Sequence, residues 1–275
     1  MKIFYHNDLD GRCAAAIVYR AMGMKTNDEY IEMDYNRSVL VDSILPNEAI
    51  IIVDFSFKPE VMEKVLKITQ NIVWIDHHKT IFDYKYSKEL SGVRDTAFSG
   101  CELAWNYYFF DKPMPRAVEL IGDRDKWAWK FGKETAEFNM GMQVRSHQPQ
   151  DTVWTTLLLS PKEGFNWLKE IQKDGRIALL FRDQFCKDYV DSYGFETEFE
   201  GYKCFALNLY QFGSEAFDSY MEKYDVCLSF VFDGEKWKVS LYSKTIDVSE
   251  IAKKYNGGGH TKAAGFICNK LPFKG

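Results

Sequence analysis

The chain has 275 residues, of which 46% are hydrophobic and 27% charged, and its formal net charge is −5 at pH 7. This length predicts two domains, the composition is that of a folded globular protein, and no apolar run approaches the roughly 18 residues that span a bilayer, so no membrane insertion is expected. The acidic balance argues against sequence-independent binding to long nucleic acids, which needs many lysines and arginines, but it allows a small anionic substrate.

The chain begins with a predicted strand, Lys2 to Tyr5, and an alanine-rich helix that includes Cys13 to Val18. Because the N-terminus turns polar so early, it lacks the pattern of a secretory signal, and we expect a cytoplasmic protein. The loop between strand and helix presents three polar side chains spaced by two residues: His6, Asp8 and Asp10. An extended backbone would direct them to one side, as metal ligands require, with Gly11 allowing the turn into the helix. The alternative is that Asp10 only caps the helix.

Two further predicted strands end in the same residue types. Ala49 to Val53 is a continuous apolar run that stops at Asp54, and Ile72 to Ile75 stops at Asp76-His77-His78. Continuous apolar strands are typical of a parallel sheet covered on both faces, here with Lys58 to Thr69 as a crossover helix and Glu29 to Met33 as another strand. Ligands of open parallel sheets bind at the carboxyl ends of strands, so a site is predicted at this edge.

The middle of the chain is predicted to be helical, over 100–110, 115–121, 134–146, 151–159 and 165–193. The last of these helices is long enough to connect two lobes. The carboxylate pair Asp123 and Asp125 follows the second helix. In isolation the pair is explained equally well by a solvated helix end and by a contribution to the site. Nearby Trp127 and Trp129 could stack on a base, although aromatic residues more often lie in a core.

From Phe195 the pattern changes to short strands, with Glu200-Gly201 and Asp233-Gly234 as hairpin turns. A helix predicted over 248–255 is followed by Gly257, Gly258, Gly259 and His260. Three glycines let backbone amides approach an anion closely, and His260 could add a hydrogen bond to it. The alternative is a glycine-rich turn that ends the helix.

Together these motifs resemble the DHH phosphoesterase superfamily, in the branch with the DHH-associated C-terminal domain that includes RecJ exonucleases and NrnA-type oligoribonucleases. The resemblance is carried, in order, by His6-x-Asp8-x-Asp10-Gly11, Asp54, Asp76-His77-His78, Asp123 and the glycine motif with Ala263-Ala264-Gly265-Phe266. It implies an α/β fold: a catalytic domain over 1–160 with a parallel sheet and helices on both faces, a helical linker over 161–194, and a smaller α+β substrate domain over 195–275.

The resemblance also implies two divalent cations, with manganese expected and magnesium or cobalt as alternatives. Asp54 would bridge them, His6 and Asp8 would bind one ion, and Asp10, His77 and Asp123 the other, with Asp125 competing for the last position. A bridging water, acidified to hydroxide, would attack phosphorus while His78 stabilises charge on the phosphoryl oxygens. Arg94, the three glycines and His260 would bind substrate.

The leading hypothesis is therefore a phosphoesterase for short oligonucleotides, dinucleotides or nucleotide phosphates. A RecJ-like exonuclease is the alternative within enzymes, and it is disfavoured by the acidic balance. The non-enzymatic alternative is a sensor that binds a nucleotide without hydrolysing it. This alternative predicts that the metal-binding motifs are broken. The substrate, the physiological metal and the oligomeric state, for which a homodimer is allowed, are left open.

Overall fold

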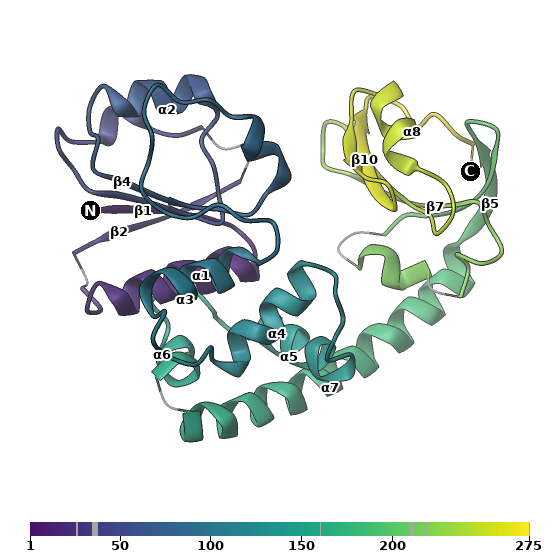
Figure 1. Cartoon of the computed structure of the whole chain (residues 1–275). Helices are drawn as coiled ribbons and strands as arrows, with labels where there is room; N and C mark the ends of the chain where they lie inside the picture. The colour runs from purple at the N-terminus through teal and green to yellow at the C-terminus, as the bar shows by residue number, and fades with distance from the viewer. Residues whose placement is uncertain (26, 35–37, 160, 210–211, 218, 275) are drawn as a thin grey trace. The chain divides into compact units, whose positions relative to one another are not determined.

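The computed structural model (Figure 1) describes every residue of the chain except 26, 35–37, 160, 210–211, 218 and 275. The chain divides into two compact units, Met1–Leu179 and Leu180–Gly275. The division falls inside helix α7 (Pro161–Tyr193), so the three-part division expected from the sequence stays a prediction. Among the residues that the structure describes, no helix has both the length and the apolar character needed to cross a membrane.

Four parallel strands form the sheet of the first unit, in the order β2-β1-β3-β4. They are β1 (Lys2–His6), β2 (Glu29–Met33), β3 (Ile50–Val53) and β4 (Ile72–Ile75). Alternate side chains enter two separate cores: Ile51 and Val53 lie in one, and Ile50 and Ile52 in the other. Helix α2 (Pro59–Leu66) covers one face, while α1 (Leu9–Ala21) and α3 (Gly100–Tyr108) cover the opposite face (Figure 1). The predicted parallel sheet with helices on both faces is confirmed.

The remaining helices of the first unit pack outside α1 and α3. They are α4 (Arg116–Asp125), α5 (Lys133–Gln143), α6 (Thr152–Leu159) and the start of α7. The 3-10 helices η1 (Val41–Ser43) and η2 (Lys79–Asp83) lie on the opposite face of the sheet, where Val41 and Ile81 contribute to the same core as α2. Small side chains of α1, Ala14, Ala15 and Ala16, are fully buried and let neighbouring elements approach closely. Helix α4 continues four residues beyond Ile121, where the sequence predicted its end, so that Asp123 and Asp125 both lie on the helix.

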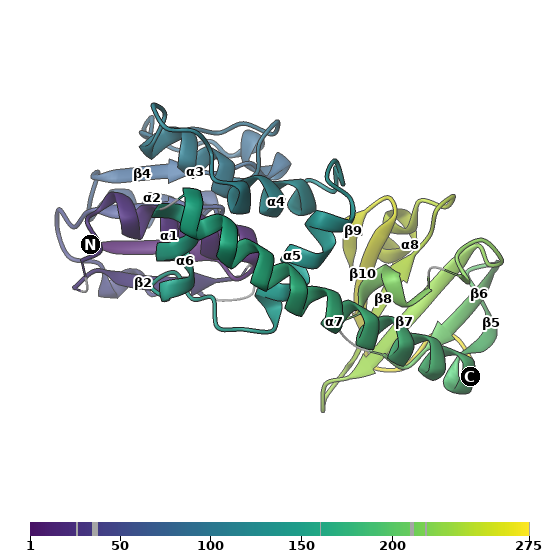
Figure 2. The same ribbon diagram turned by 90° about the horizontal axis from the view of Figure 1, so that it is seen from below.

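Six strands form a mixed sheet in the second unit, in the order β5-β6-β7-β8-β10-β9 (Figure 2). They are β5 (Phe195–Phe199), β6 (Tyr202–Leu207), β7 (Val226–Phe232), β8 (Trp237–Tyr242), β9 (Gly258–His260) and β10 (Ala263–Cys268). Helix α8 (Val248–Lys254) contributes to the core on one face of the sheet. The last turns of α7 and the 3-10 helix η3 (Gly213–Phe217) contribute to the core on the other. The predicted α+β unit and its long preceding helix are confirmed.

The glycine motif is a strand rather than the turn or open loop expected from the sequence. Gly258, Gly259 and His260 pair antiparallel with Gly265, Ala264 and Ala263 of β10. A side chain at Gly257 would meet the carbonyl oxygen of Gly265 at 2.1 Å, so that position requires glycine. Glycine has little strand preference of its own, and here the strand conformation comes from pairing with a neighbour that the sequence pattern did not reveal.

Candidate metal centre

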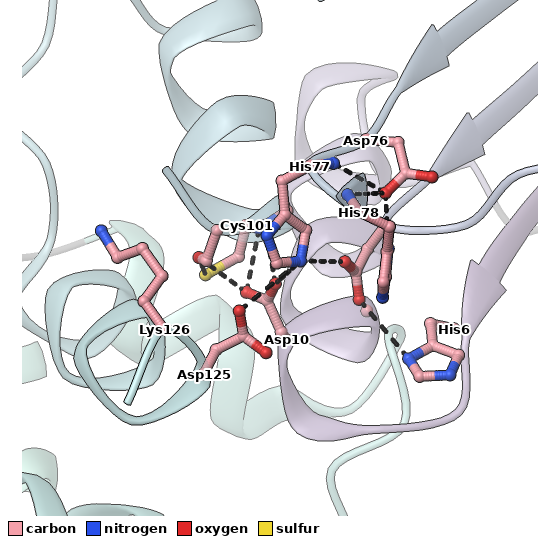
Figure 3. A network of polar contacts seen from close by, with 12 residues as sticks. His6, Asp10, Asp76, His77, His78, Cys101, Asp125 and Lys126 are labelled. Atoms are coloured by element: carbon pink, nitrogen blue, oxygen red, sulfur yellow. Dashed lines mark hydrogen bonds and ion pairs between the residues drawn. The ribbon is translucent and has the colours of Figure 1, made fainter. Parts of the chain in front are cut away.

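Three adjacent strands deliver the polar residues of the site to the same edge of the first sheet (Figure 3). His6 is the last residue of β1, Asp54 follows β3, and Asp76-His77-His78 follows β4. Asp8 and Asp10 enter from the start of α1, and Asp125 from the end of α4. These residues form three overlapping groups whose potential ligand atoms lie within 4.8 Å of one another: His6-Asp8-Asp54, Asp54-His77-His78 and Asp10-His77-Asp125.

Asp54 lies at the centre of the cluster, and only 1% of its surface is exposed. Its φ of 52° is in the left-handed region, which is uncommon for a residue with a side chain and is a frequent feature of functional sites. The backbone is held there by a hydrogen bond from its N–H to the carbonyl oxygen of Ile75, with N and O 2.9 Å apart. The carboxylate lies against Gly100, where any side chain would come within 2.5 Å of Oδ1.

Neither carboxylate oxygen of Asp54 has a hydrogen-bond partner among the described residues. Burial, and then the negative charges of Asp10, Asp8 and Asp125, raise the pKa of this carboxyl well above its ordinary value. A buried carboxylate that accepts no hydrogen bond is costly, and a bound cation offsets this cost. The charge distribution around Asp54 therefore fits a site that binds cations.

His77 connects Asp54 to the second group of ligands. Its Nε2 atom lies 3.1 Å from Asp54 Oδ1, 3.5 Å from Asp125 Oδ2 and 3.8 Å from Asp10 Oδ2. Burial lowers the pKa of His77, which favours the neutral ring that can bind a metal. One imidazole nitrogen and three carboxylate oxygens thus converge on one small volume.

His6 and Asp8 form the other side of the cluster. His6 Nδ1 lies 2.7 Å from Asp8 Oδ2 and 3.8 Å from Asp54 Oδ2. The second oxygen of Asp8 accepts a hydrogen bond from the Gly11 N–H at 2.9 Å, so Asp8, rather than Asp10, is the N-cap of α1. Gly11 is needed for close packing rather than for a turn, because a side chain there would lie 2.3 Å from the carbonyl oxygen of His6.

Asp10 is held by the beginning of α3. Its oxygens accept hydrogen bonds from the N–H groups of Gly100 at 2.6 Å and Cys101 at 3.0 Å, and from Ser99 Oγ at 2.9 Å. A helix N-terminus stabilises negative charge, so this contact both orients Asp10 and lessens the cost of burying it. The contact joins residues about 90 positions apart in the chain, which no local sequence pattern predicts.

Asp76, the first residue of the triplet Asp76-His77-His78, orients its neighbours and is not part of the three groups. Its Oδ1 accepts hydrogen bonds from the His77 N–H at 2.7 Å and lies 2.7 Å from His78 Nδ1, while Oδ2 accepts one from Ser56 Oγ. Burial alone would lower the pKa of His78, but the hydrogen bond and charge of Asp76 raise it above its ordinary value. Asp76 therefore fixes the ring of His78 and favours its cationic form.

The two carboxylates at the end of α4 have different surroundings. The side chain of Asp123 accepts hydrogen bonds from the Lys130 N–H at 2.7 Å, the Phe131 N–H at 3.2 Å and the Thr135 hydroxyl. Although burial acts in the opposite direction, these bonds hold the pKa of Asp123 below its ordinary value. The structure does not bring Asp123 into the cluster, and the preference for this residue passes to Asp125.

Asp125 faces the cluster, and its Oδ2 has no hydrogen-bond partner among the described residues. Burial and the charges of Asp10 and Asp8 raise the pKa of Asp125 to about 9. Residues two apart on a helix point in nearly opposite directions, so a helix that extends to 125 can present only one of the pair. Both Asp123 and Asp125 continue an apolar row of α4, so the helical phase alone does not choose between them, and the choice comes from the hydrogen bonds that hold Asp123 elsewhere.

Of the predicted substrate residues, His78 belongs to the cluster, whereas Arg94 is not part of the three groups. The guanidinium of Arg94 donates to the carbonyl oxygens of Trp74 and Leu90, both at 3.2 Å, and lies 4.9 Å from the centre of the Trp74 ring. Gly257, Gly258, Gly259 and His260 belong to the second unit, where β9 is exposed to solvent. Their part in substrate binding remains a prediction.

Two family models match this chain: the DHH family N-terminal domain over residues 1–121 and the DHHA1 domain over residues 214–271. A protein of Acanthamoeba polyphaga mimivirus that is named only as uncharacterized is 29% identical over 247 residues, which cover 83% of this chain and 56% of that protein. The chain thus spans little more than half the length of this relative.

Two solved structures share the fold at low sequence identity. The pGpG-specific phosphodiesterase PggH of Vibrio cholerae has a TM-score of 0.54 at 13% identity, covering 98% of this chain and 93% of that one. RecJ of Thermus thermophilus in complex with Mn²⁺ has a TM-score of 0.52 at 12% identity, covering 97% of this chain and 49% of that one. At these identities the likeness concerns the fold alone.

Proposed function

Since the chain belongs to the DHH superfamily and carries a C-terminal DHHA1 domain, we propose that it is a metal-dependent phosphoesterase acting on nucleotides or short oligonucleotides. The observation that carries the proposal is the surroundings of Asp54: a buried carboxylate in a left-handed backbone conformation, with neither oxygen hydrogen-bonded among the described residues, a ring nitrogen of His77 3.1 Å away and three further carboxylates near it. Without cations this arrangement opposes folding, and with them it is a binding site.

The ligand atoms fit two cations. His6, Asp8 and Asp54 would hold one, and Asp10, His77 and Asp125 the other, with Asp54 next to both groups. Ligands around an ion with bonds of about 2.1 Å lie roughly 3 Å apart, which is close to the separation of His77 Nε2 from the nearest carboxylate oxygens. Mixed oxygen and imidazole donors suit Mn²⁺ and allow Mg²⁺ or Co²⁺.

When bound, the cations would offset the charge of a phosphoryl group and acidify a water molecule for attack on phosphorus. His78 would complete this stabilisation, because a ring nitrogen of His78 lies within 4.8 Å of ligand atoms of both Asp54 and His77. Asp76 holds the ring in place and favours its protonated form, so His78 can donate a hydrogen bond to a phosphoryl oxygen as negative charge develops there.

A tryptophan turn beside Asp125 favours substrates that contain a nucleobase. Trp127 is 54% exposed, and both Trp127 and Trp129 have left-handed backbones, with φ of 56° and 53°. Asp123 holds this turn through the Ala128 and Lys130 N–H groups, and the guanidinium of Arg124 lies 4.2 Å from the centre of the Trp127 ring. A left-handed backbone is strained in a bulky residue, and such strain is characteristic of functional sites. An exposed indole ring is also suited to stacking on a base.

Hydrolysis assays with the 275-residue chain and Mn²⁺ test the proposal. The substrates are the linear dinucleotide pGpG, short RNA and DNA oligomers, a nucleotide bisphosphate, a long single-stranded DNA and pyrophosphate. We expect the nucleotide-containing short substrates to be cleaved and chelation to stop the reaction.

Asp54→Asn serves as the inactive control, because it alters one side chain at the centre of the cluster and nearly preserves its volume. Cleavage that survives in this variant would come from a contaminant. Tight binding of nucleotides without hydrolysis of any substrate would replace the phosphoesterase by a sensor, and preference for the long strand would favour the exonuclease alternative.

A further inference from the structure

A cavity of about 480 Å³ opens among the helices of the first unit, away from the residues of the cluster. Its described lining comes from α1, α3, α4, α6 and the start of α7, together with the segment that precedes α4. This volume lies within the range of about 300 to 1,000 Å³ that is usual for small-molecule sites. The aromatic rings of Trp105 and Phe165 form part of the wall, beside aliphatic side chains such as that of Leu157. The cavity is thus suited to a small organic molecule with a ring.

The charged part of the described lining is entirely cationic: Arg20, Lys112 and Arg116. Arg116 is neutralised by Glu134 and Glu119, each with an N–O distance of 2.8 Å. Within the described part of the chain, no carboxylate forms an ion pair with Arg20 or Lys112.

Arg20 is held in place by the protein itself. Its guanidinium carbon lies 4.6 Å and 5.3 Å from the ring centres of Phe109 and Trp105, and Nη1 donates to the carbonyl oxygen of Leu158. A planar cation fixed between aromatic rings and a carbonyl keeps further N–H groups in a defined orientation for an anionic partner. Two positive charges at an apolar cavity therefore indicate a ligand that is both organic and acidic.

We propose that this cavity binds a small organic anion, with its ring against Trp105 and Phe165 and its acidic group at Arg20 and Lys112. Two helices connect the cavity to the cluster. Helix α1 carries Asp10 in its first turn and Arg20 in its last, about 15 Å apart at the usual rise per residue. Helix α4 carries Ala117, which lines the cavity, at one end and Asp125 at the other. An occupant that displaces either helix would move a carboxylate of the cluster, so we expect binding at the two places to be coupled.

The test uses the metal-free 275-residue chain, with the fluorescent aromatic anion anilinonaphthalene sulfonate as the probe. We expect one saturable site whose affinity falls about tenfold or more in Arg20→Gln and in Lys112→Glu, since each removes a charged contact. Met114→Trp, which fills the cavity, should abolish binding. Lys236→Glu is the matched control, because it reverses an exposed lysine in the second unit and should bind the probe as the natural protein does.

Wild-type affinity in Lys112→Glu and Met114→Trp, or no saturable binding to the natural protein, would overturn the assignment. Lys112 is exposed, so its variant tests the site even where Arg20→Gln does not fold.

The coupling rests on the metal site proposed above and is measured separately, as the Mn²⁺ affinity with and without saturating probe. A change of about fivefold or more, absent in Met114→Trp, is expected, and equal affinities would overturn the coupling. Failure of the natural protein to bind Mn²⁺ at all would contradict the metal site, whereas the probe titration needs no metal.

Discussion

Two regions of this protein are predicted to bind ligands, and they differ in the groups that they present. They are the cluster of carboxylates and histidines at the strand ends of the first unit, and the glycine-rich edge strand β9 of the second unit. In the cluster, Asp10 and Asp54 are 2% and 1% exposed, and their charges repel each other at short range. In β9 every residue is exposed, and the predicted contact with substrate would come from backbone N–H groups rather than from a buried charge. A buried cluster of like charges costs stability until a ligand compensates it, whereas an exposed edge does not. Substitutions in the cluster should therefore change the free energy of unfolding as well as the activity, whereas substitutions in β9 should change the activity alone.

Asp54→Asn should give the largest effect. We expect bound metal to be lost and hydrolysis to fall by about a thousandfold or more, because the central carboxylate adjoins both ligand groups. The metal-free variant should nevertheless be more stable than the metal-free natural protein, by roughly 1 to 3 kcal/mol, because a buried acid that makes no hydrogen bond is replaced by a neutral amide that can donate to a neighbouring carboxylate. Metal analysis measures the loss of bound metal, and thermal unfolding in the presence of a chelator measures the gain in stability. A variant that keeps its metal and its activity would show that Asp54 is not central.

The next-largest effects are expected at His77 and His78, and the two variants should lose different properties. His78→Gln should keep its metal and lose about 100 to 1,000-fold in rate, since it removes one donor to the developing phosphoryl charge. His77→Gln should instead weaken Mn²⁺ binding, because Nε2 faces three carboxylate oxygens. Calorimetric titration with Mn²⁺ and turnover at saturating metal separate the two roles. Equal metal affinities in both variants would remove the distinction.

Asp125→Asn and Asp123→Asn form a matched pair only two residues apart. Asp125→Asn should weaken metal binding by roughly 10 to 100-fold without destabilising the metal-free protein, since a repelling charge is removed. Asp123→Asn should keep its metal but lower the free energy of unfolding by about 1 to 3 kcal/mol, because it weakens the hydrogen bonds that hold the tryptophan turn. The reverse pattern would restore Asp123 as the ligand.

These carboxylates also show which features of the site can be predicted from the sequence. Apolar runs that end in His or Asp predicted the parallel strands, and parallel topology placed His6, Asp54 and His77 at one edge. The choice between Asp123 and Asp125 depended on the hydrogen bonds that hold Asp123 elsewhere, which the helical period does not reveal. The contact of Asp10 with the N-terminus of α3 and the pairing of β9 with β10 join segments whose partners no local period identifies.

The smallest of these effects is expected at β9. His260→Ala should lower kcat/KM about tenfold for a dinucleotide while leaving metal content, stability and hydrolysis of a minimal aryl phosphodiester unchanged. The side chain is exposed and makes no contribution to the buried cores, so a loss confined to the larger substrate would identify it as a remote binding contact. His147→Ala is a suitable comparison, because this histidine contacts Arg12 and the carbonyl oxygen of Arg145 in the first unit and has no proposed part in catalysis. If His260→Ala slowed both substrates equally, the glycine-rich edge would act in the chemical step, and the contrast between a catalytic cluster and a binding edge would no longer hold.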